Sequence, residues 1–358
     1  MIIVSDNIKN ITPYVPGKPL EELERELGIT GSIKLASNEN PLGPSPKAVA
    51  AIKKALEGLN RYPDGAGYYL SQALAEKYDV DISQIILGNG SNELIELVVR
   101  TFVQVGDEVV SADPSFMVYK MITQAAGGRN VVVPLKDNRH DLEAMADRIT
   151  SKTKLVFIAN PNNPTGTMNT KIEMDRFIDR MPDQVIVAVD EAYFEYVTHA
   201  DYPDSSDYLR AGKNVLVLRT FSKIYGLAGL RIGYGITKPQ IAEFMNNVRQ
   251  PFNTNSPGQI GALAALADRK HVDKSIAINN EGKQFLYQSF DRLGVSFIKT
   301  ETNFIMFETA FDGRELYGML LKKGVIIRSM GGKRLRVTIG LPEENRRFVS
   351  ELEKILQQ

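Results

Sequence analysis

The chain has 358 residues, with 43 Lys and Arg against 43 Asp and Glu, so its formal net charge is zero. This balance excludes a protein that is drawn as a whole to nucleic acid or to an anionic membrane. Cysteine is absent, which excludes disulfides and thiolate metal sites, and the three histidines are too far apart in sequence to form a typical metal motif.

Length and hydropathy predict a globular protein with two domains. Apolar residues make up 43% of the chain, enough for a sizeable core, and domains usually have about 100–200 residues. No apolar run reaches the length of about 18 residues that a membrane span needs. The run at residues 1–6 is too short for a signal peptide, so we expect a cytoplasmic protein.

The first 40 residues are predicted to form an N-terminal arm that packs with the small domain. Leu20–Leu27 has the pattern of a short helix, and Gly28 follows as a typical helix stop.

From residue 41 to about residue 250, short apolar runs alternate with longer segments of helical periodicity. The runs are residues 85–87, 108–111, 131–133, 155–159, 185–189 and 215–218. Continuous apolar runs of this length are typical of strands buried on both faces. We therefore predict an α/β fold: a large, doubly wound, mostly parallel sheet covered by helices.

Residues 251–358 are predicted to form a smaller α+β domain, because the pattern changes there. Residues 250–257, rich in Pro and Asn, break the alternation, and a long helical stretch follows over about 257–293. Short apolar runs then surround a helix near 313–322. These runs are residues 296–298, 304–307, 325–328 and 335–338.

Polar clusters directly follow four of the apolar runs in the large domain. They are Gly88–Glu93, Asn160–Gly166, Asp190–Tyr193 and Thr220–Arg231. In open α/β sheets, ligands bind outside the carboxyl ends of the strands. We therefore expect the clusters to gather along one edge of the sheet.

The first two clusters are ambiguous when each is taken alone. Gly88–Glu93 precedes a helix and suits an anion, but it also suits a tight turn with a capped helix. It lacks the third glycine of a dinucleotide-binding fingerprint. Asn160–Gly166 is either a turn rich in Asn and Pro or a stiff loop that fixes an amide side chain.

The other two clusters carry an acid and a lysine. Asp190 ends a buried strand, where it could cap the strand, bind a metal or pair with a ring nitrogen. Lys223 follows a buried strand, and such an amine can form a Schiff base when burial or nearby cations lower its pKa. Taken alone, Ser222 and Lys223 would read as a solvated loop with Arg231 on the surface.

Together, the clusters match the requirements of one cofactor, pyridoxal 5′-phosphate. It needs a lysine for its aldehyde and an acid for its pyridinium nitrogen. Its phosphate needs an arginine, hydroxyl groups and a helix N-terminus. Its ring also needs an aromatic face, for which Phe116 is the candidate unless it only fills the core.

With these residues the chain resembles the fold-type I pyridoxal-phosphate aminotransferases from about residue 11 to residue 357, and most of all the histidinol-phosphate aminotransferase family. The segments that carry the resemblance are residues 13–17, 35–43, 61–64, 160–166, 190–193, 220–231 and 335–340. Lys223 and its neighbours are specific to the superfamily. Tyr14, Asn38–Pro41 and Arg61–Pro63 narrow the resemblance to this family.

The resemblance implies a role for each site residue. Lys223 is the catalytic residue that condenses with the aldehyde. At the cofactor ring, Asp190 would pair with the nitrogen, Asn163 and Tyr193 would bind the phenolic oxygen, and Phe116 (often Tyr in this family) would stack on the ring face. The cofactor phosphate would be held by Ser91, Asn92, Ser222 and Arg231. Tyr62 would reach this phosphate from the neighbouring subunit. Arg336 would bind the substrate carboxylate or phosphate, helped by Arg328, Tyr14 and Asn38.

The implied protein is a homodimer with shared active sites and no bound metal. It would convert histidinol phosphate and 2-oxoglutarate to imidazole acetol phosphate and glutamate, a ping-pong transamination of histidine biosynthesis. An aromatic or broad-specificity aminotransferase and a phosphothreonine decarboxylase remain alternatives. The sequence lacks the glycine fingerprint expected of a nucleotide-dependent oxidoreductase. A regulator that senses pyridoxal phosphate would need a DNA-binding segment, and we expect none at either terminus.

Overall fold

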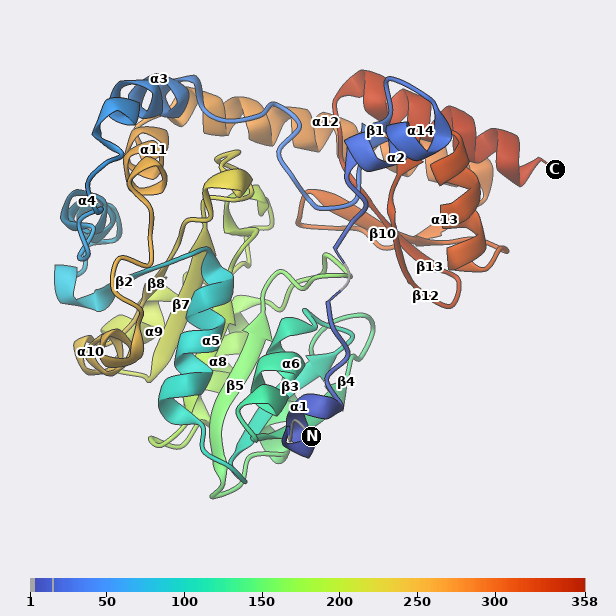
Figure 1. Ribbon diagram of the computed structural model, residues 1–358. Helices are drawn as coiled ribbons and strands as arrows, with labels where there is room; N and C mark the ends of the chain where they lie inside the picture. Colours follow the sequence, from blue (N-terminus) through green and yellow to red (C-terminus); the bar gives the residue numbers. More distant parts are fainter. Residues whose placement is uncertain (1–3, 15, 358) are drawn as a thin grey trace.

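The computed structural model describes residues 4–14 and 16–357, and two sheets with their helices form its two main bodies (Figure 1). The first three residues of the predicted arm, and Val15 of the segment 13–17, lie outside the described residues. The larger sheet has seven strands and the smaller has four. The long helix α12 (Arg269–Leu293) runs from one body to the other.

The larger sheet confirms the predicted α/β fold class. Its strand order is β2-β8-β7-β6-β5-β3-β4, and every pair is parallel except the two that include β8. The strands are β2 (Ile85–Gly88), β3 (Glu108–Asp113), β4 (Arg129–Pro134), β5 (Thr153–Ala159), β6 (Ile186–Asp190), β7 (Val215–Thr220) and β8 (Gly233–Ile236). All six predicted runs therefore fall on strands, with only Val185 lying one residue before β6.

Strand β8 was not predicted, because two of its four residues are glycines and the segment resembles a turn. Glycine is needed there for close packing. A Cβ atom on Gly235 would lie 3.0 Å from side-chain atoms of both Ile86 and Leu216. The sheet tolerates the weak strand because both neighbours bond to it along its whole length.

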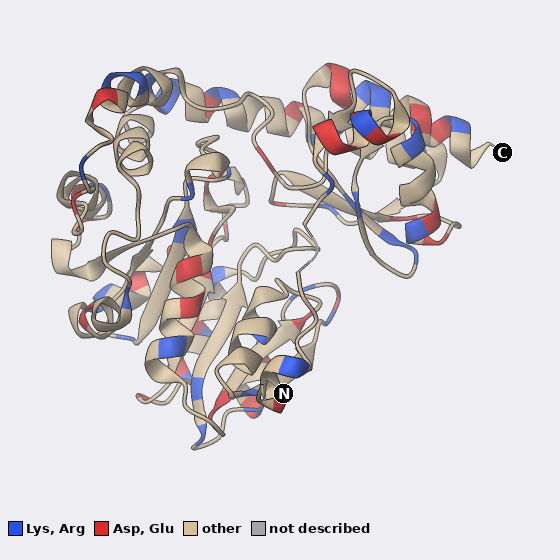
Figure 2. Cartoon of the chain, in the orientation of Figure 1, with Lys and Arg blue, Asp and Glu red and all other residues tan. Residues whose placement is uncertain are grey.

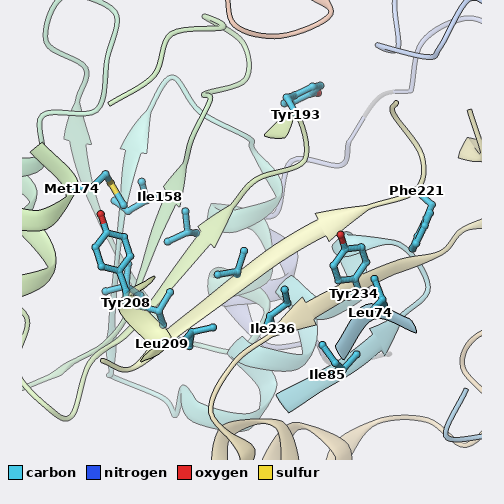
Figure 3. Close-up of a cluster of buried hydrophobic side chains, with 14 of the residues drawn as sticks. Leu74, Ile85, Ile158, Met174, Tyr193, Tyr208, Leu209, Phe221, Tyr234 and Ile236 are labelled. Atoms are coloured by element: carbon cyan, nitrogen blue, oxygen red, sulfur yellow. The ribbon is translucent and has the colours of Figure 1, made fainter. Parts of the chain in front are cut away.

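Helices cover both faces of the larger sheet. They are α3 (Pro46–Ala55), α4 (Tyr68–Tyr78), α5 (Ser91–Phe102), α6 (Val118–Ala125), α7 (Leu142–Asp147), α8 (Lys171–Asp179), α9 (Ser206–Arg210), α10 (Pro239–Val248) and α11 (Ser256–Leu266), with single 3₁₀ turns at Leu56–Gly58, Ile82–Gln84, Phe194–Tyr196 and Ala228–Leu230. Successive strand residues point to opposite faces. Val156 packs in the cluster beneath α8, part of which Figure 3 shows, whereas Leu155 packs in the cluster beneath α5.

The smaller sheet is antiparallel, with the strand order β12-β13-β10-β9. Its elements are β9 (Ser296–Phe297), β10 (Phe304–Glu308), β12 (Arg328–Gly331), β13 (Arg334–Thr338), α13 (Gly313–Lys322) and α14 (Pro342–Leu356). The apolar run over 325–328 does not form a single strand of this sheet. Its first half, β11 (Val325–Ile326), pairs in parallel with β1 (Ile33–Lys34) instead, because the N-terminal segment supplies its hydrogen bonds.

The predicted helical stretch over 257–293 is also two helices, α11 and α12, which meet near Asp268. The carboxylate of Asp268 accepts a 2.6 Å hydrogen bond from the Ser45 hydroxyl at the start of α3. This contact fixes the chain at the break, where the backbone of Asp268 leaves the helical region.

The N-terminal segment runs between the two bodies (Figure 1). Near α1 (Asp6–Lys9), Asn7 donates hydrogen bonds to backbone carbonyls of α6. Helix α2 (Leu20–Leu27) ends at Gly28 with φ 63°, as predicted, and its Leu23 packs against Ile326 of the smaller body. Residues 4–34 therefore reach from the large sheet to the small one.

Acidic and basic residues are interspersed along the chain in Figure 2, in keeping with the zero net charge. Within residues 4–14 and 16–357, no helix combines the length and apolar character needed to cross a bilayer.

Candidate active site

The carboxyl ends of six strands lie at one edge of the large sheet, and five of them, β2, β3, β5, β6 and β7, contribute to the site. Strand β8 is antiparallel to both β2 and β7, so β2 runs in the same direction as the parallel strands. A cavity of about 310 Å³ lies at this edge and is lined by the loops that follow these strands. A larger hollow of about 590 Å³ beside α7 and α8 contains none of the predicted residues.

All but two of the predicted site residues line this cavity. They are Tyr14, Asn38, Ser91, Asn92, Phe116, Asn163, Asp190, Tyr193, Ser222, Lys223, Arg231 and Arg336. The two that do not line it are Tyr62 and Arg328.

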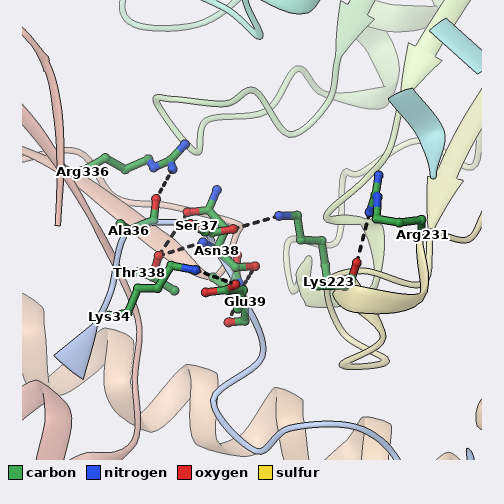
Figure 4. A network of polar contacts seen from close by, with 11 residues as sticks. Lys34, Ala36, Ser37, Asn38, Glu39, Lys223, Arg231, Arg336 and Thr338 are labelled. Carbon is green, nitrogen blue, oxygen red and sulfur yellow. Dashed lines mark hydrogen bonds and ion pairs between the residues drawn. The ribbon is translucent and has the colours of Figure 1, made fainter. Parts of the chain in front are cut away.

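Lys223 reaches into the cavity from the turn after β7. Its Nζ atom donates a 3.1 Å hydrogen bond to the carbonyl of Ser37 and lies 5.7 Å from the ring centroid of Tyr193 (Figure 4). Burial, together with the positive charges of Arg336 and Arg231, lowers the pKa of Lys223 to about 8. A substantial fraction of the amine is therefore neutral, and nucleophilic, slightly above neutral pH.

Asp190 ends β6 and is almost fully buried, with 7% of its surface exposed. One carboxylate oxygen accepts a 2.7 Å hydrogen bond from the Tyr119 hydroxyl, and the other accepts a bond from the backbone of Ala192 at 3.1 Å. Burial raises the pKa of Asp190, while these two hydrogen bonds and the Lys223 charge oppose the rise. A buried carboxylate of this kind favours a cationic partner.

Arg231 and the start of α5 form an anion pocket. The guanidinium donates to the Ser222 hydroxyl at 3.1 Å, and Gly90 lets it come close, because a Cβ atom there would lie 2.3 Å from Nη2. Helix α5 begins at Ser91 without a side-chain cap. Its first backbone N–H groups are therefore free to bind an anion, as the first turn of a helix commonly does.

Arg336 connects the two bodies at the cavity. It extends from β13 and donates to the Ala36 carbonyl at 2.8 Å (Figure 4). It also donates to the Asn163 side-chain oxygen at 2.5 Å. Its Nε atom has no hydrogen-bond partner among the described residues. Asn163 accepts through its oxygen in this bond, which leaves its amide nitrogen as a donor for a ligand.

The Tyr193 hydroxyl accepts a 2.8 Å hydrogen bond from the side-chain amide of Asn38. Asn38 is 2% exposed, and its amide oxygen accepts a bond from Thr338 at 3.2 Å. Both ends of this amide therefore have protein partners, while the side chain also lines the cavity, so its role in substrate binding stays a prediction. The Tyr193 hydroxyl keeps its proton for a further acceptor.

The remaining predicted residues lie around the cavity or away from it. Phe116 lines it and meets Tyr119 edge to face at 5.6 Å. The Arg328 guanidinium lies 5.4 Å from the ring centroid of Tyr14, at the rim. Tyr62 is 82% exposed and stacks on Phe252 at 4.7 Å, outside the cavity of its own chain.

Sequence reasoning missed one side chain that bears on the site, Tyr119. It lies three residues after Phe116, the predicted stacking residue. Tyrosines on helices usually fill cores, and no sequence pattern indicates that this hydroxyl reaches Asp190, 71 residues away.

Comparison with known proteins agrees with this geometry. The family described as aminotransferase class I and II matches residues 30–352. The histidinol-phosphate aminotransferase of Moorella thermoacetica is 51% identical, over 98% of this chain and 92% of the relative. Histidinol-phosphate aminotransferase 2 of Carboxydothermus hydrogenoformans is 46% identical, over 99% of both chains.

Solved structures give the same result. The histidinol-phosphate aminotransferase of Sinorhizobium meliloti, solved in complex with pyridoxal-5′-phosphate, superposes with a TM-score of 0.91 at 28% identity, covering 99% of this chain and 97% of that chain. The aspartate aminotransferase of Thermus thermophilus shares the fold, with a TM-score of 0.87 at 21% identity over 99% of this chain. This chain belongs to the class I and II aminotransferases and, within them, to the histidinol-phosphate aminotransferase family.

Proposed function

We propose that the protein transfers the amino group of histidinol phosphate to 2-oxoglutarate, giving imidazole acetol phosphate and glutamate, as a step of histidine biosynthesis in the cytoplasm. The relatives that carry this name match nearly the whole chain at 45–51% identity. The observation that carries the chemistry is the single cavity lined by Lys223, Asp190 and Arg231.

The cofactor in this proposal is pyridoxal 5′-phosphate, and the residues present fit it. The pocket of Arg231, Ser222 and the α5 N-terminus suits the phosphate, and the absence of a Cβ atom on Gly90 lets the Arg231 guanidinium lie beside the start of α5. Asp190 suits a protonated ring nitrogen. When bound, the cofactor supplies an electron-withdrawing ring that stabilises charge left on the substrate Cα atom.

The chain's own groups do the remaining work. The Lys223 amine, with its lowered pKa, accepts the proton from the substrate Cα atom as a general base, a contribution of roughly 10²–10⁴-fold to the rate. Asp190 holds positive charge at the ring nitrogen. Tyr193 and the amide nitrogen of Asn163 serve as donors to the phenolic oxygen.

Arg336 is the proposed anchor for the acidic groups of both substrates. A guanidinium binds carboxylate and phosphate with the same two-pronged geometry. Arg336 is 8% exposed, lines the cavity and retains an unpaired Nε atom among the described residues. Arg328 and Tyr14, in contact at the rim, are proposed to assist it.

A homodimer with shared sites is part of the proposal. Large apolar side chains are exposed around Tyr62, among them Leu56 and Leu59, each 50% exposed, and Tyr69, 75% exposed. A cluster of this kind usually marks a protein interface. Tyr62, held by stacking on Phe252, is then available to the phosphate pocket of the neighbouring subunit.

We also propose an arm over residues 1–40, a large domain from residue 41 and a small C-terminal domain. The predicted boundary at residue 250 is better placed within α12. Ala262 and Ala265 of α11 pack in the core of the large sheet, whereas Leu286 and Phe290 of α12 pack in the core of the small body.

Substrate competition tests the proposed function. We expect the highest kcat/KM with histidinol phosphate when it is compared with phenylalanine and tyrosine as amino donors. An equal or higher value with the aromatic amino acids would identify an aromatic aminotransferase instead. Release of carbon dioxide from phosphothreonine would identify a decarboxylase.

A further inference from the structure

The Tyr119 hydroxyl is a buried polar group that the proposed chemistry does not use. It lies 2.7 Å from a carboxylate oxygen of Asp190. Tyr119 is 1% exposed and Asp190 is 7% exposed, so water does not compete freely for this bond.

Packing fixes the direction of this hydroxyl. The Tyr119 ring stacks on Phe157 of β5 with centroids 4.5 Å apart and planes inclined by 7°. The Tyr119 ring also meets the Phe116 ring edge to face, with centroids 5.6 Å apart. Because Phe157 belongs to the strand beside β6, which ends at Asp190, the phenol and the carboxylate are held by neighbouring strands of one sheet.

The hydrogen bond from Tyr119 favours the ionised state of the Asp190 carboxyl group and one orientation of it. A hydroxyl that donates to a carboxylate stabilises its ionised form, and charge-assisted bonds of this type are strong. The other oxygen of Asp190 accepts from the Ala192 backbone at 3.1 Å. The ionisable groups that interact with the Asp190 carboxyl are Tyr119 itself, Lys223, Tyr193 and Tyr202, and of these only Lys223 brings a positive charge.

We propose that Tyr119 is a positioning residue for the reaction: its hydroxyl keeps Asp190 ionised and correctly oriented to pair with the protonated ring nitrogen of the cofactor. This inference rests on the proposed function, in which pyridoxal phosphate occupies the cavity. A tyrosine that only fills the core would have no effect on the cofactor beyond a loss of stability.

The variant Tyr119→Phe keeps the stacked ring and removes the hydroxyl. The matched control is Tyr234→Phe, because Tyr234 is fully buried and its hydroxyl bonds to Tyr78 at 2.7 Å, away from the cavity. We expect Tyr119→Phe to raise the dissociation constant of pyridoxal phosphate on the order of 10-fold. Tyr234→Phe should leave it unchanged, even if both variants melt at lower temperature.

A second readout needs no cofactor. In cofactor-free protein labelled with carboxyl-¹³C aspartate, the resonance that disappears in Asp190→Asn reports the titration of Asp190. We expect the pKa of Asp190 to be higher in Tyr119→Phe than in the wild type. 3-Fluorotyrosine at position 119, a stronger donor, should shift it the other way, which keeps the test open if Tyr119→Phe does not fold.

A double-variant cycle establishes whether Tyr119 acts through Asp190. We expect Tyr119→Phe to have no further effect on cofactor affinity once Asp190→Asn is present. An equal loss in both backgrounds, or an unchanged affinity and an unchanged Asp190 titration in Tyr119→Phe, would overturn the proposal. A wild type that does not bind pyridoxal phosphate would instead refute the proposed function, whatever the ¹³C titration shows.

Discussion

The charge state of Lys223 is the residue-scale property on which the proposed chemistry depends. The amine is hydrogen-bonded to the Ser37 carbonyl, and the guanidinium groups of Arg336 and Arg231 both disfavour its protonation. The chain therefore holds an amine ready to react with an aldehyde, without a carboxylate paired directly with it.

This arrangement predicts how cofactor capture depends on pH. Only the neutral amine attacks an aldehyde, and the pKa of Lys223 is lowered to about 8, so the rate of capture by cofactor-free protein should rise as pH passes through this value. Stopped-flow absorbance after mixing with pyridoxal phosphate measures the rate. A midpoint near 10.5, the ordinary value for lysine, would contradict the assigned environment.

Arg336 gives a prediction about substrate binding. Arg336→Lys keeps the charge but loses the planar guanidinium that binds a carboxylate or phosphate through two N–H groups, so KM should rise about 10-fold or more for histidinol phosphate and for 2-oxoglutarate. Arg334→Lys is the matched control, because Arg334 lies on the same strand, 46% exposed and paired with Glu308. Unchanged KM values for both substrates in Arg336→Lys would exclude Arg336 as the common anchor.

At this scale the sequence predicted residues that line one cavity, but not the partners of their atoms. Lys223, Asp190 and Arg231 were predictable because an acid, a lysine and an arginine after buried strands match one cofactor. The bond from Asn38 to Tyr193 was not predictable, because Asn38 is positioned by Thr338, 300 residues away. Such pairings depend on how remote segments pack.

At the scale of elements, a buried ion pair joins the ends of β6 and β7, close in sequence to Asp190 at the end of β6 and to Lys223 in the turn after β7. Arg219 and Glu191 are 1% and 0% exposed, and their side chains meet at 2.7 Å. The guanidinium also packs 3.6 Å from the ring centroid of Phe194. Burial raises the pKa of Glu191, and Arg219 opposes this rise.

Removing one partner of this pair should destabilise the large domain. Arg219→Met leaves the Glu191 carboxylate buried and uncompensated, which should lower the free energy of unfolding by about 3–5 kcal/mol. Urea denaturation measures this loss. The double variant Arg219→Met/Glu191→Leu should recover much of it, and a single variant as stable as the wild type would show that the pair is not needed.

The strands were predictable where apolar residues follow one another, as in β5 and β7. Strand β8 was not, since two of its four residues are glycines, of which Gly235 packs against Ile86 and Leu216, and the strand is recognisable only beside its neighbours. The division of residues 325–328 between two sheets was also not predictable from the sequence, for a similar reason. Nothing in Val325–Ile326 indicates that an N-terminal segment will bond to it.

At the scale of the whole molecule, the two bodies meet around the cavity. Besides the bond from Arg336 to Asn163, the backbone of Glu301 donates to the Gly166 carbonyl at 2.8 Å, and its carboxylate accepts from Thr198 at 2.8 Å. The chain pattern predicted two bodies. It did not predict these contacts, because they join loops whose positions follow from the packing of both sheets.

The proposed dimer predicts complementation between two defective chains. Lys223→Ala removes the amine and Tyr62→Ala removes the side chain proposed to act in the partner's site. In a heterodimer of the two variants, isolated with separate tags, one site would receive both wild-type residues. We expect about half the activity of the wild-type dimer.

If Tyr62 acts within its own chain, the same heterodimer would contain no intact site. Its activity would then not exceed half that of the Tyr62→Ala homodimer. Val105→Ala, used in place of Tyr62→Ala, is a suitable control for subunit exchange. Val105 is 86% exposed and lies far along the sequence from the residues around Tyr62.

The decisive experiment follows the visible absorption of the protein loaded with pyridoxal phosphate. Addition of histidinol phosphate alone should shift the absorption band, and addition of 2-oxoglutarate should restore it, because each half-reaction reverses the other at the same site. Lys223→Ala should lack both the initial band and the cycle. A protein that stays colourless with pyridoxal phosphate, or a Lys223→Ala variant that cycles like the wild type, would show that this cavity does not perform the transamination.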